Sequence, residues 1–182
     1  MNKRWDALTR RLPRNAKITG AEIGVWQGQM SEQLLRMNPK MFLILVDRWC
    51  CPPAGDSYFE GSRVMSRHPQ SRFDAAYADT IRRVTPFADR VKVYKMTSVQ
   101  AAARIEDGSL DFIFIDGDHS YKGVTTDLQL WTPKVRAGGL ISGHDWGNSG
   151  TFQDVEHAVI DFFGNKNGIE IDVNNTWFKI NI

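Results

Sequence analysis

The chain of 182 residues is long enough for one domain with a sizeable core, and its 42% hydrophobic and 24% charged residues are typical of a soluble globular protein. The formal net charge of +2 gives no electrostatic reason to expect a nucleic-acid partner. No apolar stretch approaches the roughly 20 residues of a membrane span, and the first residues, MNKRWDALTR, lack the apolar centre of a signal peptide. Cys50 and Cys51 are adjacent, which disfavours a disulfide, so we expect reduced thiols and a cytoplasmic location.

Short apolar segments alternate with helical patterns along most of the chain. The predicted strands cover 18–24, 42–47, 91–95, 111–116 and 139–143. One predicted helix begins after Ser31, its candidate N-cap, and three others cover 72–84, 98–104 and 121–135. Residues 42–46 and 112–115 are continuously apolar, as in strands that helices cover on both faces of a parallel sheet. The alternation predicts an α/β fold with a doubly wound, mostly parallel, Rossmann-like sheet.

The end of the chain breaks this alternation. Residues 168–173 and 176–180 are two strand-like segments joined around Asn174 and Asn175, and asparagine tolerates the positive φ of a tight turn. We therefore predict a single domain, 1–182, that closes with a C-terminal antiparallel hairpin. Residues 48–71 form a long irregular segment rich in Pro, Gly and Ser, which we interpret as a substrate lid.

A glycine-rich turn follows the first predicted strand. GAEIGVWQGQ places Glu22, Gly24 and Gly28 in the pattern E-x-G-x-x-x-G, where glycine lets the backbone turn sharply and lets a ligand approach the main chain. The dinucleotide pattern G-x-G-x-x-G has one glycine more. The acid here repels a pyrophosphate and attracts an ammonium or a sulfonium group. A tight turn with a surface glutamate would explain the same residues without any ligand.

Asp47 ends the second predicted strand, and Trp49 follows it. A carboxylate at this strand tip can accept two hydrogen bonds from ribose hydroxyls, and the ligand site of such sheets lies beyond the carboxyl ends of the strands. Trp49 is placed to cover an adenine ring. The alternative is an acid that caps a loop.

These features together resemble the class I S-adenosylmethionine-dependent methyltransferases over roughly residues 18 to 182. The resemblance implies S-adenosylmethionine as the cofactor, with Glu22, Gly24 and Gly28 at its methionine end and Asp47 on the ribose. The stretch YKMTS resembles the segment that lies along the adenine, which nominates Ser98 for an adenine contact. Ser98 is also a candidate N-cap of the helix 98–104, and the two roles are compatible.

Two further strand ends carry ionisable groups. Asp116 ends the predicted strand 111–116, and His144 and Asp145 follow the strand 139–143, so the carboxylates are expected to meet and to need a shared cation. Carboxylates suit Mg²⁺ or Mn²⁺, whereas an imidazole favours Mn²⁺, Fe²⁺ or Zn²⁺. The segments DGDHSY and GGLISGHDW resemble a bacterial group related to metal-dependent O-methyltransferases of the sugar and catechol type. The resemblance implies Asp116, His144 and Asp145 as metal ligands, although His144 stands where the family usually has an acid. A metal-free acid–base pair of His144 and Asp145 and a purely structural role stay open.

His119, three residues after Asp116, resembles the general base of such enzymes, which makes His119 and Asp116 the candidate catalytic residues. A loop histidine packed on Tyr121 is the structural alternative. The expected partner is a small-molecule methyl acceptor, a sugar or a phenol, held by an aromatic rim of Trp49, Tyr58, Phe59 and Trp146. No nucleic acid or membrane is expected, and homo-oligomerisation is left open. The rival functions are a non-catalytic cofactor-binding protein and a nicotinamide-dependent oxidoreductase.

Overall fold

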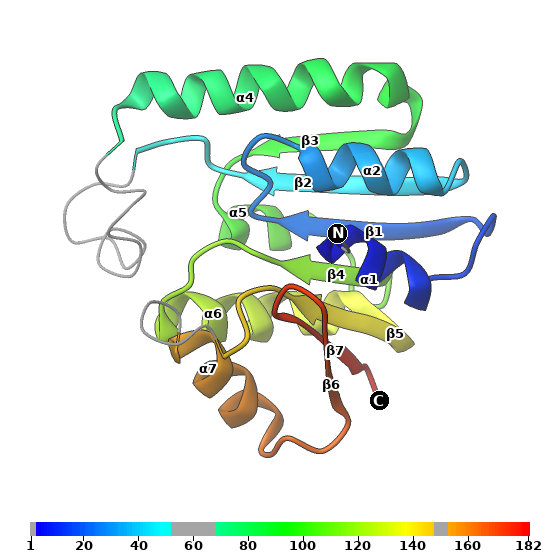
Figure 1. Ribbon diagram of the computed structural model, residues 1–182, viewed down its shortest axis with the longest axis vertical. Coiled ribbons are helices and arrows are strands. Elements are labelled where there is room, and N and C mark those ends of the chain that lie inside the picture. The colour runs from blue at the N-terminus through cyan, green and yellow to red at the C-terminus, as the bar shows by residue number, and fades with distance from the viewer. Residues whose placement is uncertain (1–2, 52–67, 148–152) are drawn as a thin grey trace.

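The computed structural model describes residues 3–51, 68–147 and 153–182 (Figure 1). Its seven strands form one sheet in the order β3-β2-β1-β4-β5-β7-β6. Strands β1 to β5 are parallel, whereas β7 pairs antiparallel with β5 and β6 pairs antiparallel with β7. The strands are β1 (Ile18–Ile23), β2 (Met41–Asp47), β3 (Val91–Lys95), β4 (Leu110–Ile115), β5 (Val135–Gly143), β6 (Ile169–Asp172) and β7 (Thr176–Ile180). The predicted doubly wound sheet with a closing antiparallel hairpin is confirmed.

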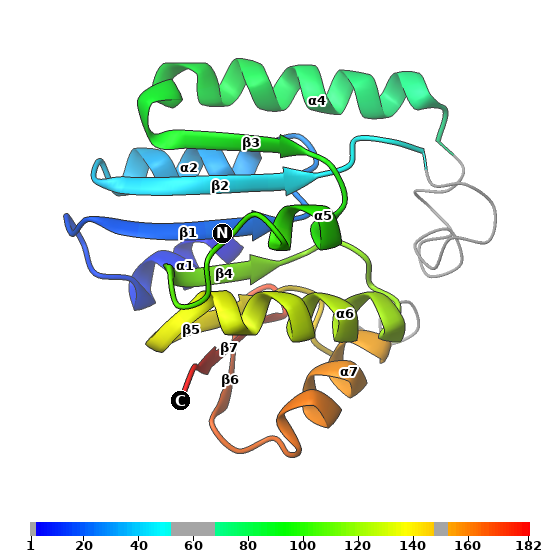
Figure 2. The same cartoon turned by 180° about the vertical axis from the view of Figure 1, so that it is seen from behind.

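Helices cover both faces of this sheet. The α-helices are α1 (Arg4–Arg11), α2 (Gln29–Met37), α4 (Gln70–Val84), α5 (Ser98–Ala102), α6 (Tyr121–Trp131) and α7 (Gln153–Phe163), with short 3₁₀ turns at Thr85–Arg90 and Thr132–Lys134. Figure 1 shows α1 and α2 in front of the sheet, and Figure 2, from behind, shows α5 and α6 over the opposite face. Among the described residues, no helix combines the length and apolar character needed to cross a bilayer.

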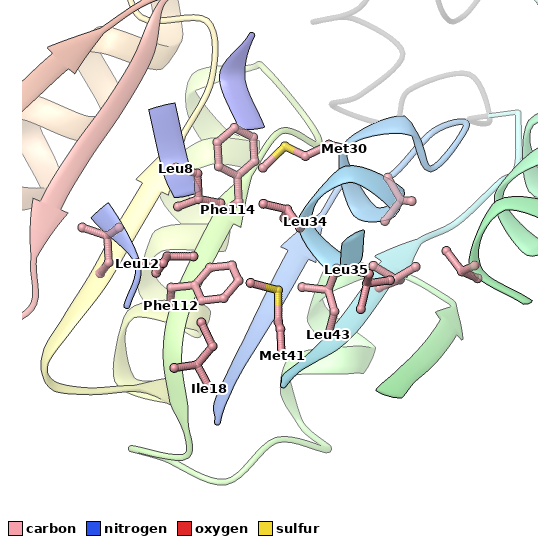
Figure 3. Packing of buried hydrophobic residues seen from close by; sticks show 14 of the residues in the cluster. Leu8, Leu12, Ile18, Met30, Leu34, Leu35, Met41, Leu43, Phe112 and Phe114 are labelled. Atoms are coloured by element: carbon pink, nitrogen blue, oxygen red, sulfur yellow. The ribbon is translucent and has the colours of Figure 1, made fainter. Parts of the chain in front are cut away.

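Two hydrophobic clusters, one on each face, hold the helices to the sheet. In the first, Leu8 of α1 and Leu34 of α2 pack on Phe112 and Phe114 of β4, and all four are fully buried (Figure 3). The second joins α5, α6 and α7 to the other face through residues such as Trp131. At about 25 cal/mol per Å² of buried apolar area, packing of this kind is the main stabilising term of the fold.

Some predicted element boundaries are wrong. Ser31 is not an N-cap, because α2 begins at Gln29 and the cap is Gly28, whose φ of 72° ends the preceding turn. The helix predicted at 121–135 ends at Trp131, since Pro133 removes a backbone donor and the chain turns through a 3₁₀ segment into β5. Strand β5 begins at Val135, four residues earlier than predicted.

The strand register sets up the functional end of the sheet. Ile23 lies beside both Val46 and Ile115, and Ile115 lies beside Gly143. The next residues in each strand are Gly24, Asp47, Asp116 and His144. These residues therefore emerge along one edge, at the carboxyl ends of the parallel strands.

Candidate active site

A cavity of about 550 Å³ opens at this edge of the sheet. That volume lies within the range of small-molecule and cofactor sites. Its walls come from the segments after β1 to β5 and from α1, α4 and α6: the residues used below are Arg4, Gly24, Trp26, Asp47, Phe73, Ser98, Asp116, His119, Asp127, His144 and Asp145. The position is the one expected for a ligand of a doubly wound sheet.

The turn after β1 can be built only with glycine at position 24. Gly24 has a φ of +87°, and a Cβ there would lie 2.1 Å from the carbonyl oxygen of Asp116. A residue with a side chain here would have a strained backbone, and its Cβ would overlap the main chain of Asp116 at the end of β4. The close approach brings the turn after β1 directly against the loop after β4.

Asp47 ties two loops of the cavity together. Its Oδ2 accepts hydrogen bonds from the backbone N–H groups of Val25 (3.0 Å) and Trp26 (2.9 Å), and its Oδ1 accepts from Trp49 N–H (2.8 Å). Burial raises the pKa of the Asp47 carboxyl, and these three hydrogen bonds oppose that rise. Asp47 thus has a structural role in addition to the ligand role predicted for it.

An acid–histidine cluster occupies the part of the cavity beside β4 and β5. His119 Nε2 lies 3.0 Å from Asp145 Oδ2 and 3.4 Å from Asp116 Oδ1. His144 Nδ1 lies 3.1 Å from Asp145 Oδ1 and 3.6 Å from Asp116 Oδ1. Arg4, which α1 carries across from the N-terminus, places its Nη1 atom 2.7 Å from Asp116 Oδ2. The cluster therefore combines two carboxylates with three groups that can carry positive charge.

The electrostatics of this cluster favour charged partners. Burial by itself lowers the pKa of His119, but its hydrogen bonds to Asp116 and Asp145 outweigh burial and raise that pKa to about 10. Burial raises the pKa of Asp145, whereas the two histidines lower it, with a net shift below the ordinary value. Asp145 also has a φ of +61°, a conformation that a non-glycine residue seldom adopts outside constrained or functional sites.

Three of these groups are arranged as metal ligands. Asp116, His144 and Asp145 each offer one ligand atom, and these atoms all lie within 4.8 Å of one another. Two carboxylate oxygens and an imidazole nitrogen form a donor set that suits Mn²⁺, Fe²⁺ or Zn²⁺ as well as Mg²⁺. The sequence prediction that the two strand tips meet is correct. The same geometry also accommodates the metal-free pair of His144 and Asp145.

Comparison with known proteins identifies the family. Residues 21–146 match the family model described as a methyltransferase domain. The chain belongs to this family. The predicted class, the S-adenosylmethionine-dependent methyltransferases, is thereby confirmed.

Solved structures share the methyltransferase fold across nearly the whole chain. The O-methyltransferase NovP superposes with a TM-score of 0.68 at 17% identity, covering 97% of this chain and 75% of NovP. A putative caffeoyl-CoA O-methyltransferase from Staphylococcus aureus gives a TM-score of 0.63 at 12% identity, covering 96% of this chain and 80% of that protein. An uncharacterized protein, y4gI, of Sinorhizobium fredii is 33% identical over 54 residues, which are 30% of this chain and only 6% of that protein.

The methyltransferase cavity contains most of the residues predicted for it. The predicted site residues that line it are Gly24, Asp47, Ser98, Asp116, His119, His144 and Asp145. Ser98 is not the N-cap of α5, because Thr97 holds that position and accepts a hydrogen bond from Gln100 N–H (3.2 Å). The hydroxyl of Ser98 is instead hydrogen-bonded to Asp127.

Three predicted cofactor contacts lie outside the cavity lining. Glu22 is buried behind the strand tip, where its Oε2 accepts a hydrogen bond from the Ser31 hydroxyl (2.6 Å). Gly28 caps α2 and packs against Thr80 of α4. Trp49 is fully buried: its indole N–H donates to Trp26 O (2.7 Å) and its ring contacts Tyr77, so its side chain does not line the cavity.

The predicted aromatic rim also needs correction. The aromatic side chains that line the cavity are Trp26 and Phe73, whose rings meet edge-to-face at 5.7 Å. Trp146 is half-buried and packs against the second hydrophobic cluster rather than lining the cavity. Tyr58, Phe59 and most of the predicted lid lie outside the described residues.

Arg4 and Asp127 are charged cavity residues that the sequence analysis did not single out. Arg4 belongs to a helix too short and polar to be recognised from its pattern. Asp127 lies on α6 beside the buried Leu128, and the only signal for it is an acid on an otherwise apolar helix face. Burial raises the pKa of Asp127 to about 7, although its hydrogen bond with Ser98 opposes this. Asp127 is thus a carboxyl group that is only partly ionised near neutral pH.

Proposed function

We propose that this methyltransferase transfers the methyl group of S-adenosylmethionine to a hydroxyl of a small molecule, a sugar or a phenol, with the help of a divalent cation. The observation that carries this proposal is the convergence of Asp116, His144 and Asp145 with His119 on one wall of the cavity. The O-methyltransferase neighbours add support at the level of the fold.

The cofactor is proposed to lie across the segments that follow β1, β2 and β3. Gly24 leaves the main chain open to the ligand, Asp47 would accept from the ribose hydroxyls, and Ser98 would face the adenine. A carboxylate has about four lone-pair positions, and backbone groups use three of those on Asp47. The ribose hydrogen bond would therefore use the remaining one, on Oδ1.

The cation is proposed to bind Asp116 Oδ1, His144 Nδ1 and a carboxylate oxygen of Asp145. The fit rests on the spacing of these ligand atoms, which all lie within 4.8 Å of one another. When bound, a divalent ion there would act as a Lewis acid that lowers the pKa of an acceptor hydroxyl. Arg4 on Asp116 Oδ2 would keep the other oxygen of that carboxylate turned inward.

His119 is proposed to take the proton from the acceptor hydroxyl. A base must be neutral before it accepts a proton. The hydrogen bonds to Asp116 and Asp145 raise the pKa of this imidazole to about 10 and therefore keep it protonated in the absence of a metal. The proposed base role therefore depends on metal coordination of these carboxylates, because their negative charge would then no longer be available to the imidazolium. In a metal-free protein, His119 would instead be an acid.

Transfer of a labelled methyl group tests the function directly. We expect label from S-adenosylmethionine to enter at least one member of a panel of sugars, catechols and small acids, to be lost in chelator, and to return with Mn²⁺ or Mg²⁺. Asp145→Ala, which removes the ligand oxygens, should abolish the metal rescue. His119→Gln should lower turnover about 10²–10⁴-fold, whereas the exposed His157→Gln on α7 should behave as the parent.

The rivals give different results in the same assay. Full activity after exhaustive chelation would contradict the metal and leave His144 and Asp145 as an acid–base pair. Tight cofactor binding without transfer to any acceptor would favour a binding protein. Binding of NAD in place of S-adenosylmethionine would favour an oxidoreductase.

A further inference from the structure

Two of the three proposed ligand side chains, Asp116 and His144, have a second atom held by another part of the fold. Asp116 turns Oδ1 toward the two histidines and Oδ2 toward Arg4. His144 turns Nδ1 toward Asp145 and Asp116, and its Nε2 lies 3.2 Å from Nδ2 of the Asn174 side chain. Partners of this kind fix the orientation of metal-ligating side chains and commonly change metal affinity when they are removed.

The hairpin between β6 and β7 holds Asn174 in place. Asn174 and Asn175 have φ values of 57° and 54°, the conformation that asparagine tolerates in a tight turn. Trp146 N–H donates to Asn175 O (3.0 Å), and the Thr176 hydroxyl donates to Val173 O (2.9 Å). The turn is therefore tied to the segment immediately after His144 and Asp145.

The amide of Asn174 can meet His144 in two ways. A neutral imidazole has one N–H and one lone pair, and an asparagine amide has a donor end and an acceptor end of nearly equal size. With Nδ2 toward the ring, the contact that the structure has, Nε2 accepts and the ring proton sits on Nδ1, where it is donated to Asp145. With Oδ1 toward the ring, Nε2–H donates and Nδ1 keeps its lone pair for a cation. The two orientations correspond to the metal-free pair and to the metal site.

We propose that Asn174 is a positioning residue that sets the tautomer of His144: with Nδ2 toward the ring, as in the structure, it keeps the proton on Nδ1, and with the amide turned so that Oδ1 accepts from Nε2–H it would leave Nδ1 free to bind a cation. The metal part of this inference rests on the proposed function; the control of the tautomer does not. The C-terminal hairpin then contributes to the site without lining the cavity itself.

Three variants of the full chain test this role through Mn²⁺ affinity, measured by electron paramagnetic resonance without cofactor or acceptor. Asn174→Leu keeps the size of the side chain but cannot accept, so we expect Mn²⁺ affinity to fall about 10–100-fold. Asn174→Asp can only accept from Nε2–H and should bind at least as tightly as the parent. Asn175→Asp adds the same charge one residue away and should match the parent.

A second background separates positioning from general damage to the turn. In His144→Asp the ring is absent, so adding Asn174→Leu should change Mn²⁺ affinity less than twofold. Nitrogen NMR of the metal-free protein reads the tautomer itself: Asn174→Asp should place the proton of a neutral His144 on Nε2.

The outcomes distinguish the two levels of the argument. Unchanged Mn²⁺ affinity in Asn174→Leu, an equal loss in the His144→Asp background, or a proton that stays on Nδ1 in Asn174→Asp would each overturn the inference. A parent protein that binds no Mn²⁺ would overturn the ligand role of Nδ1 together with the proposed metal, whereas methyl transfer itself is read in the separate labelling assay.

Discussion

Glu22 shows how one side chain can follow a family pattern and still lie outside the cavity lining. It stands at the end of β1, but it is 1% exposed and its partner is the Ser31 hydroxyl rather than the cavity. Burial raises its pKa to about 8, and the hydrogen bond from Ser31 only partly opposes this. The folded protein therefore holds Glu22 mainly in its neutral form at neutral pH.

This pKa predicts a pH-dependent stability that Glu22→Gln should remove. A raised carboxyl pKa means that stability is fully present below the unfolded value of 4.5 and is lost as pH rises toward about 8. Relative to Glu22→Gln, the free energy of unfolding of the parent should fall by up to about 1.4 kcal/mol per pH unit across that window. Denaturant unfolding at several pH values measures the difference between the two proteins.

Glu32 supplies a control of opposite sign. Arg36 and Arg83 lower the pKa of Glu32, so its contribution to stability is lost only as the pH falls below the ordinary carboxyl range. The difference between Glu32→Gln and the parent should stay flat where the Glu22→Gln difference changes. A flat profile for both variants would show that Glu22 is ionised in the folded protein.

At the scale of elements, ion pairs join α1 to the C-terminal hairpin, a contact that we call the clasp, and each of the two elements also contacts the acid–histidine cluster. Arg10 and Arg11 of α1 bind Asp172 of β6, at 3.1 and 2.5 Å, and the Arg11 guanidinium lies 4.0 Å from the ring centroid of Phe178. The same helix places Arg4 on Asp116, and the same hairpin places Asn174 against His144.

Asp172→Asn should loosen this clasp. Arg11 first, and then Val173 N–H and Arg10, lower the pKa of Asp172 to about 2. The ion pairs therefore stabilise the fold above the unfolded pKa of 3.8 and lose this effect as pH falls through about 2. At neutral pH the variant should lose about 1 kcal/mol of unfolding free energy, an effect that shrinks in high salt. Glu170→Gln removes another partner of Arg11, but that carboxylate is 70% exposed, so little change is expected in thermal unfolding.

The sequence predicts elements that have a strong local pattern, such as the strands, but not contacts between distant segments, such as the clasp. The continuously apolar segments of β2 and β4 predict buried parallel strands, and from these follow the strand tips that carry Asp47 and Asp116. Helix α1 buries only Ala7 and Leu8, so its eight residues carry too weak a pattern to predict. Arg4 and Asn174 reach the site only through packing between opposite ends of the chain, which no local pattern reports. The burial of Trp49 could not be predicted for a related reason, since tertiary contacts with Trp26 and Tyr77 turn its side chain into the core.

At the scale of the whole molecule, the strand order explains why one edge of the sheet holds the site. Strand β1 lies between β2 and β4, so the chain leaves β1 toward one side of the sheet and later returns to the other. The loops after these strands diverge at this point and leave the cavity open between them. Asp47 bridges the loops after β1 and β2, so the ribose contact proposed for it would couple ligand binding to the stability of the fold.

Thermal unfolding with S-adenosylhomocysteine tests this coupling. Ligand at about 100 times its dissociation constant adds about 2.7 kcal/mol, which should raise the parent Tm by roughly 5–10 °C. Asp47→Ala should lower the Tm of the free protein, because three backbone N–H groups lose their acceptor, and should also weaken ligand binding by about 1–3 kcal/mol.

Asp111→Ala is the matched control. Asp111 accepts hydrogen bonds from Thr19 N–H (2.7 Å) and Arg136 (2.8 Å) at the amino end of β4, away from the cavity. That variant should be destabilised yet keep the full ligand shift. If Asp47→Ala also keeps the full shift, Asp47 serves the loops alone and the ribose must be bound elsewhere.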